Sequence, residues 1–179
     1  MDTKNTKNTK NATGANTGEM LEMLDWRAIQ VALAAPFTPE QIEWRVQGRG
    51  GKGERAQVVA YVDARDIQNR LDAVVGMGGW SFTWEPIVVE GGELRVAKGS
   101  LTIFGVTRED VGAASNYEPS KGAVSDALKR AAVGFGIGRH LYDLPAVWVT
   151  LDDKGRIPDG ELAKLRAAVK RRIEQASAA

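Results

Sequence analysis

The chain contains few side chains that could act as nucleophiles or metal ligands. It has no cysteine and a single histidine, His140. Thiolate nucleophiles, disulfides and zinc sites built from Cys and His are therefore excluded, and a Ser–His–acid triad would have to use His140. No partner close in sequence activates this imidazole, so we expect His140 to be structural. We predict no catalytic residue.

A glycine-rich segment matches nucleotide-binding motifs only as a string of letters. Gly48, Gly50 and Gly53 have the spacing of the dinucleotide fingerprint, but that motif opens a helix, and here a second strand is predicted to follow. A Walker A loop needs Ser or Thr after Gly-Lys, and Gly53 follows Lys52. ATP hydrolysis and a nucleotide cofactor are therefore not expected.

The acidic pairs do not predict a metal site. Glu109 and Asp110 are neighbours in a predicted strand, so their side chains point to opposite faces. The Asp152-Asp153 pair lies in a predicted turn, where carboxylates are usually solvated. Asp159 and Glu161 stand at the start of a predicted helix, where acids satisfy free N–H groups. We expect no metal and no other cofactor.

Charge is balanced overall but segregated locally. The chain has 24 Lys and Arg against 23 Asp and Glu, a formal net charge of +1, so no global excess indicates a nucleic-acid or membrane partner. Residues 41–56 nevertheless hold four basic and two acidic side chains, and residues 121–142 hold four basic and one acidic. These two segments are the candidates for a cationic surface.

The hydrophobic pattern predicts an α+β fold. The expected elements are a helix from Leu21 that ends at Pro36, a hairpin of strands 42–49 and 57–62, a helix after Asp63, strands at 80–89, 94–104 and 106–114, and helices at 120–135 and 161–175. We interpret residues 1–19 as a disordered tail, 20–150 as one domain, and 151–179 as an acidic turn with a basic helix. No apolar run is long enough to span a bilayer and no secretion signal is present, so we expect a cytoplasmic, nucleoid-associated protein without a membrane partner.

The helix at 120–135 has the clearest pattern, with apolar residues at the helical period. With Ala123 at zero on a helical wheel, Lys129 falls at about 240° and Arg130 at about 340°, both on the polar arc. One interpretation is a solvated face with an Asp126–Arg130 ion pair. The other is a binding surface.

Several segments together resemble one known family. They are IEWRV followed by glycines, AYVDARDIQNRLDAVVGMGGWSF, REDVG and, most specifically, SKGAVSDALKRAAVGFGIGRHLY. Over about residues 26–150 the chain resembles the single-strand annealing domain of the Rad52/22 recombination family, and especially its bacterial DNA damage response members. The resemblance implies a β-hairpin and a curved antiparallel sheet packed on a long helix. It also implies a ring-like homo-oligomer with single-stranded DNA in a basic outer groove.

The resemblance implies four DNA-binding residues: Arg45, Tyr61, Lys129 and Arg130. The family's next basic residue after the Lys-Arg pair is Val133 here, and the hairpin tip is longer than in eukaryotic members, so the inner path of the strand is left open. Additional candidates for DNA contact are Arg49, Lys52, Arg55, Arg95, Lys98, Arg108, Lys121 and Arg139. Of these, Arg95, Lys98 and Arg108 are guesses for a second, outer site.

The resemblance further implies an ATP-independent protein that binds and anneals single-stranded DNA in repair or recombination, with other repair proteins as partners and no enzymatic activity. The alternative is a protein that shields 3′ ends from nucleases without annealing. Trp44, Tyr61, Trp80 and Trp84 are candidates either for the core or for stacking on bases, and the core is the favoured role for all of them except Tyr61.

Overall fold

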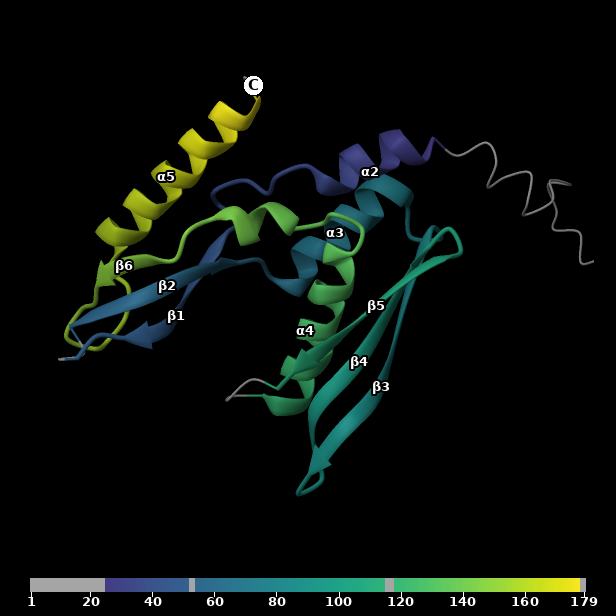
Figure 1. Ribbon diagram of the computed structural model, residues 1–179, viewed down its shortest axis with the longest axis horizontal. Helices are drawn as coiled ribbons and strands as arrows, with labels where there is room; N and C mark the ends of the chain where they lie inside the picture. Colours follow the sequence, from purple (N-terminus) through teal and green to yellow (C-terminus); the bar gives the residue numbers. More distant parts are fainter. Residues whose placement is uncertain (1–24, 52–53, 115–117, 178–179) are drawn as a thin grey trace, which may run out of the picture.

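Two three-stranded antiparallel sheets flank one long helix in the computed structural model, which describes residues 25–51, 54–114 and 118–177 (Figure 1). The first sheet, here called the hairpin sheet, has the strand order β1 (Glu43–Arg49), β2 (Arg55–Tyr61), β6 (Val147–Thr150). The second sheet has the order β3 (Trp80–Glu90), β4 (Glu93–Ile103), β5 (Val106–Ala113). The long helix is α4 (Pro119–Val133).

The predicted α+β class is confirmed, and so are the hairpin, the three-stranded meander and the long helix. The four-residue strand β6 was not predicted. It pairs with β2, so that β2 becomes a central strand and the hairpin becomes a sheet. The predicted tail at 1–19 and the candidate Lys52 lie outside the described residues.

Glycines let α4 pack closely on the second sheet. A Cβ at Gly112 of β5 would collide with the backbone of Ala123 and Ala127. A Cβ at Gly99 of β4 would lie only 2.8 Å from the Ala127 side chain, which is closer than real Cβ atoms approach. Ala123 and Ala127 are themselves fully buried. The small residues of the sheet and the helix therefore set their separation, and Lys129 of α4 is left on the side that faces Tyr61 of the hairpin sheet.

One face of the hairpin sheet is covered by α5 (Asp159–Ser177). Ala56, Val58 and Val149 of the sheet form a buried cluster with Leu165 of α5, which is 4% exposed. Val169, one helical turn later, is 3% exposed and belongs to the main core. Helix α5 is therefore part of the folded core.

Helices α2 (Trp26–Ala34) and α3 (Ala64–Val75) meet at Arg70. Arg70 donates hydrogen bonds to two carbonyl oxygens at the C-terminal end of α2: that of Leu33 in its last turn (3.2 Å) and that of Ala35 just after it (2.6 Å). The Arg70 guanidinium lies 4.5 Å from the ring centre of Phe37. The Nε2 atom of His140 accepts a hydrogen bond from the Phe37 amide at 3.3 Å. Burial and the Arg70 charge lower the pKa of His140, so the imidazole is neutral and has the structural role expected.

Replacing Leu165 with Ala should destabilise the fold by about 2–4 kcal/mol, because a buried leucine is lost between α5 and the hairpin sheet. Denaturant unfolding measures this change. The matched control is Lys164→Ala, whose exposed side chain pairs only with Glu161 on the same helix and should change stability by less than about 0.5 kcal/mol. A Leu165→Ala protein as stable as the parent would show that α5 does not belong to the core.

Candidate nucleic-acid interface

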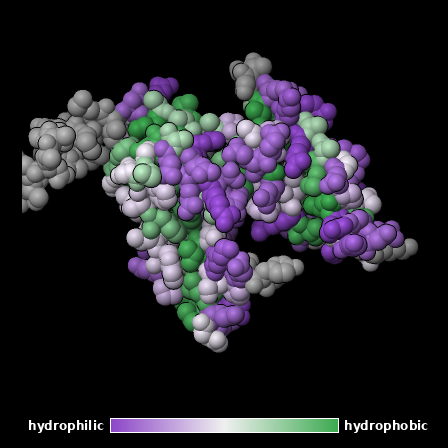
Figure 2. Space-filling view, turned by 180° about the vertical axis from the view of Figure 1, so that it is seen from behind, coloured by the Kyte–Doolittle hydropathy of each residue, from purple (hydrophilic) through white to green (hydrophobic). Residues whose placement is uncertain are grey.

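A groove lies between α4 and the face of the hairpin sheet that α5 leaves uncovered. It encloses about 370 Å³, and the residues lining it include Arg45, Tyr61, Lys129 and Arg130. Figure 2 shows the molecule from behind, hollowed between the arm built by β3–β5 and the arm built by the hairpin sheet, with hydrophilic side chains gathered along the hollow. The structure thus brings together the four positions that the family resemblance picked from distant parts of the chain.

Strand alternation sorts the hairpin side chains between α5 and the groove. Arg45 of β1 pairs with Val59 of β2, and Glu43 pairs with Tyr61, so these four side chains share the face toward the groove. Trp44, between Glu43 and Arg45, points the other way and packs against the core. The prediction of a core role is therefore confirmed for Trp44.

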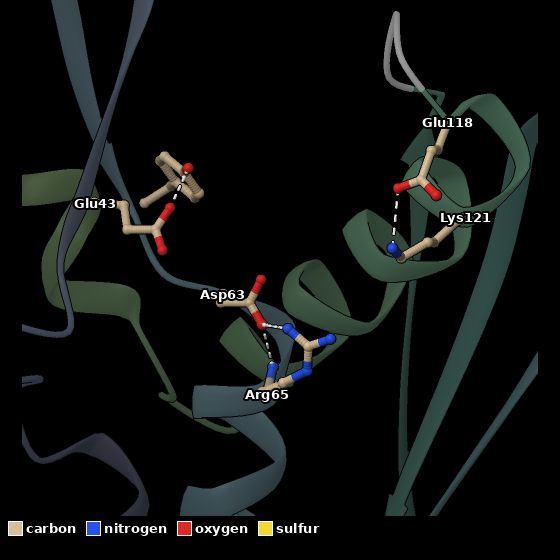
Figure 3. Close-up of polar contacts among 6 residues, drawn as sticks. Glu43, Asp63, Arg65, Glu118 and Lys121 are labelled. Carbon is tan, nitrogen blue, oxygen red and sulfur yellow. Dashed lines mark hydrogen bonds and ion pairs between the residues drawn. The ribbon is translucent and has the colours of Figure 1, made fainter. Parts of the chain in front are cut away.

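Lys129 and Tyr61 meet across the groove. The Lys129 ammonium lies 5.5 Å from the centre of the Tyr61 ring, a cation–π distance. The Tyr61 hydroxyl donates a hydrogen bond to the Glu43 carboxylate (Figure 3). Burial, and then this hydrogen bond, raise the pKa of Tyr61 to about 12. Tyr61 therefore stays a neutral phenol at neutral pH and presents no negative charge to a phosphate.

Arg130 is partly neutralised by a residue that the sequence did not indicate. Its Nε atom lies 3.3 Å from the carboxylate of Asp110, on β5. That hydrogen bond is the main cause of a raised Arg130 pKa, with a smaller contribution from the charge of Asp126. The Asp126–Arg130 ion pair of the solvated-face interpretation is not formed: Arg130 pairs with Asp110, and the Asp126 carboxylate accepts a hydrogen bond from the Ala113 amide at 3.2 Å.

Arg45 and Lys129 differ from Arg130 in having no carboxylate within ion-pair distance among residues 25–51, 54–114 and 118–177. Arg45 does act on Tyr61, since its charge opposes the rise of the Tyr61 pKa. Two uncompensated cations therefore line the groove, one on the hairpin and one on α4. This is the arrangement that binds a phosphate backbone.

Among the additional candidates that the structure describes, only Arg55 shares this face. It alternates with Gln57, Val59 and Tyr61 along β2, and it has no carboxylate partner within the described chain. The others are held elsewhere: Arg49 by the Gly155 carbonyl at 3.2 Å, Arg139 by the Val133 carbonyl at 2.7 Å, and Lys121 by Glu118 at 2.9 Å (Figure 3).

The three guesses for a second site are not brought together. Arg95 pairs with Glu93 and Lys98 pairs with Glu109, each at 2.9 Å. Lys98 lies opposite Val111 in the ladder, whereas Arg108 lies opposite Leu101, so Lys98 and Arg108 point to opposite faces of the second sheet. Arg108 instead packs beside Phe135.

Two other kinds of site are not found within the described residues. They contain no group of three or more histidine or acidic side chains that could hold a metal ion. None of their helices is long and apolar enough to cross a membrane.

The expected core role fails for one tryptophan. Trp80 packs against the core and donates its indole N–H to Asp72 at 2.8 Å, as a core tryptophan does. Trp84 is 48% exposed. It continues the alternation of Trp80 along β3 and lies opposite Gly99, and nothing in the local pattern distinguishes the two positions.

The structure is a small α+β domain that holds a hairpin against a helix bearing a Lys-Arg pair. The chain belongs to the Rad52/22 family of double-strand break repair proteins, which it matches over residues 25–158. The match ends just before α5, so that helix lies outside it.

The relatives include bacterial and fungal proteins. The chain is 48% identical to the single-stranded DNA-binding protein DdrA of Deinococcus radiodurans over 132 residues, 73% of this chain and 62% of that protein. It is 47% identical to DdrA of Deinococcus deserti, with 73% and 64% covered. It is 32% identical to the DNA repair and recombination protein RAD52 of Saccharomyces cerevisiae, with 64% and 28% covered. The predicted resemblance to the bacterial DNA damage response members is confirmed, and the chain spans less than two thirds of the length of each of these relatives.

Lys129→Ala should weaken binding of an oligo-dT strand and flatten the slope of log affinity against log salt by about 0.7, because one phosphate contact is lost. Arg130→Ala should lose less, since Asp110 already offsets part of the Arg130 charge. Alanine favours helix, so both variants should stay folded. Fluorescence anisotropy at several salt concentrations measures the binding, and thermal melting checks the fold.

The matched control for this comparison is Lys164→Ala, which removes the same charge from α5, the helix that covers the opposite face of the hairpin sheet. It should leave the affinity and the salt slope nearly unchanged. Binding by Lys129→Ala that equals the parent at every salt concentration would remove α4 from the interface.

Proposed function

We propose that this protein binds single-stranded DNA in the groove between the hairpin sheet and α4, and anneals complementary strands without ATP. The observation that carries the proposal is the pair of uncompensated cations, Arg45 and Lys129, that line one groove together with the neutral ring of Tyr61. The names of the relatives agree: DdrA is a single-stranded DNA-binding protein, and RAD52 is a protein of DNA repair and recombination.

The groove chemistry suits a strand held without sequence preference. Cations on a helix and a sheet attract phosphates of any sequence, while the bases are free to face outward and meet a complement. Annealing is downhill in free energy, so the protein needs only to hold strands extended and close together. The proposed activity therefore requires neither a nucleotide nor a metal.

We also propose that copies of the domain assemble into a ring-like homo-oligomer. Strand β2 has partners on both sides, which leaves β1 as one edge of the hairpin sheet. A longer edge strand is β3, on which Ile87 and Val89 are 53% and 57% exposed. Figure 2 shows hydrophobic surface running down this arm. Exposed apolar edge strands tend to pair with another chain, and repeated grooves would add avidity.

The assembly is tested by light scattering. The parent should have a mass several times the 19.3 kDa of one chain. Ile87→Lys with Val89→Lys should lower the mass by placing charges on the β3 edge. Val31→Lys, at a 68% exposed position on α2, is the matched control and should leave the mass unchanged. A parent that is monomeric at micromolar concentration would contradict the proposal.

Annealing is tested with two complementary labelled oligonucleotides in EDTA without ATP. The parent should speed their pairing, and Arg45→Ala with Lys129→Ala should do so much less, because the cations that hold the phosphates are gone. An equal rate with and without the parent protein would contradict annealing.

The alternative function is end protection without annealing. One observation favours it: the residues proposed for a second site are ion-paired or point to opposite faces, so Arg95, Lys98 and Arg108 do not form a second cationic track for a complement. A 3′-exonuclease assay on a labelled single strand, run beside the annealing assay, separates the two functions. Protection without faster pairing would establish the alternative.

A further inference from the structure

Trp148 is an exposed aromatic side chain in the middle of the short strand β6. It is 47% exposed, whereas its neighbour Val149 is 2% exposed. The side chain of Trp148 makes no hydrogen bond and no aromatic-ring contact with another described residue. Packing in the core does not account for a tryptophan at this position, because the side chains that anchor β6 against α5 are those of the neighbouring valines.

The pairing of β6 with β2 places Trp148 on the groove face of the hairpin sheet. Trp148 lies opposite Gln57, and Gln57 alternates with Val59 and Tyr61 on the face shared with Arg45. Gln57 is four residues from Tyr61 along β2, or about 13 Å at the usual rise of a strand. Figure 1 shows β6 lying along β2 in this sheet. Trp148 thus continues the groove surface toward the hairpin tip.

The surroundings of Trp148 form a second hollow, lined also by Gly50, Gly51, Glu54 and Arg55. A Cβ placed on Gly50 would lie 3.5 Å from Cζ3 of Trp148, so the indole lies beside a residue that has no side chain. Arg55 adds a cation without a carboxylate partner in the described chain. The acidic Glu54 disfavours a phosphate at its end of the hollow, whereas a neutral base is not repelled.

We propose that Trp148 is a stacking platform for a nucleobase of the strand whose phosphates lie along Arg45 and Lys129, with Arg55 contacting the next part of the backbone. This inference rests on the proposed DNA-binding function and extends the path of the strand along the hairpin sheet toward its tip. Aromatic stacking accepts every base, so it strengthens binding without giving sequence preference. It also distinguishes strands that carry bases from a bare phosphate backbone.

The test compares an oligo-dT strand with an abasic strand of the same length, using anisotropy with the full chain. Trp148→Ala should weaken binding of oligo-dT by about fivefold to a hundredfold, the range spanned by base–aromatic stacking. The Trp148→Ala variant should bind the abasic strand as tightly as the parent does. Its slope of log affinity against log salt should not change, because no phosphate contact is lost. Trp148→Phe should keep most of the affinity.

Lys129→Ala is the matched comparison, because it should weaken binding of both strands and flatten the salt slope. Normal binding of oligo-dT by Trp148→Ala, or an equal loss on both strands, would overturn the stacking role even where Lys129→Ala shows that the groove is used. A parent that binds neither strand would instead overturn the proposed function. Melting curves check the fold, and Trp148→Leu, which keeps an apolar side chain but has no ring, replaces Trp148→Ala if that variant melts early.

Discussion

The close contact between α4 and the second sheet is the constraint on which the groove depends. Gly112 and Gly99 remove the side chains that would hold the helix away, and Ala123 and Ala127 meet them from α4. Packing at this distance fixes the rotation of the helix as well as its depth, because only the alanine stripe fits. Lys129, on the polar arc, is then directed toward the hairpin.

The hairpin sheet supplies the other wall because its two faces have different partners. Residues such as Val58 and Val149 are buried against α5, and the alternate positions are left for the groove. Arg45 and Tyr61 contribute little apolar burial themselves. The sheet that carries them is therefore stabilised by packing on its other face. Helix α5 therefore supports the wall of the groove from the other face of the sheet, although it lies outside the family match.

The basic residues carry the same charge but differ in whether a carboxylate pairs with them. Lys98 and Arg95 are partnered by carboxylates on their own sheet, and exposed pairs of this kind offer a phosphate less net attraction. Arg45 and Lys129 have no such partner in the described chain, and Arg130 is intermediate because Asp110 reaches it from β5. The cations therefore differ in how far carboxylates offset their charge, and the least offset, Arg45 and Lys129, lie where the hairpin faces the helix.

The sequence by itself determined the α+β class, the hairpin, the meander and the polar arc of α4, because these depend on local periodicity and turn residues. The family resemblance added Arg45 and Tyr61 to the Lys-Arg pair. Only the tertiary structure decided that Arg130 contacts Asp110 instead of Asp126, that Trp84 is exposed, and that the short strand β6 carries Trp148 onto the groove face. Each of these outcomes depends on strand register and on packing between elements distant in the chain. A local pattern does not contain that information, since a four-residue strand or an ion pair across two elements has no period of its own.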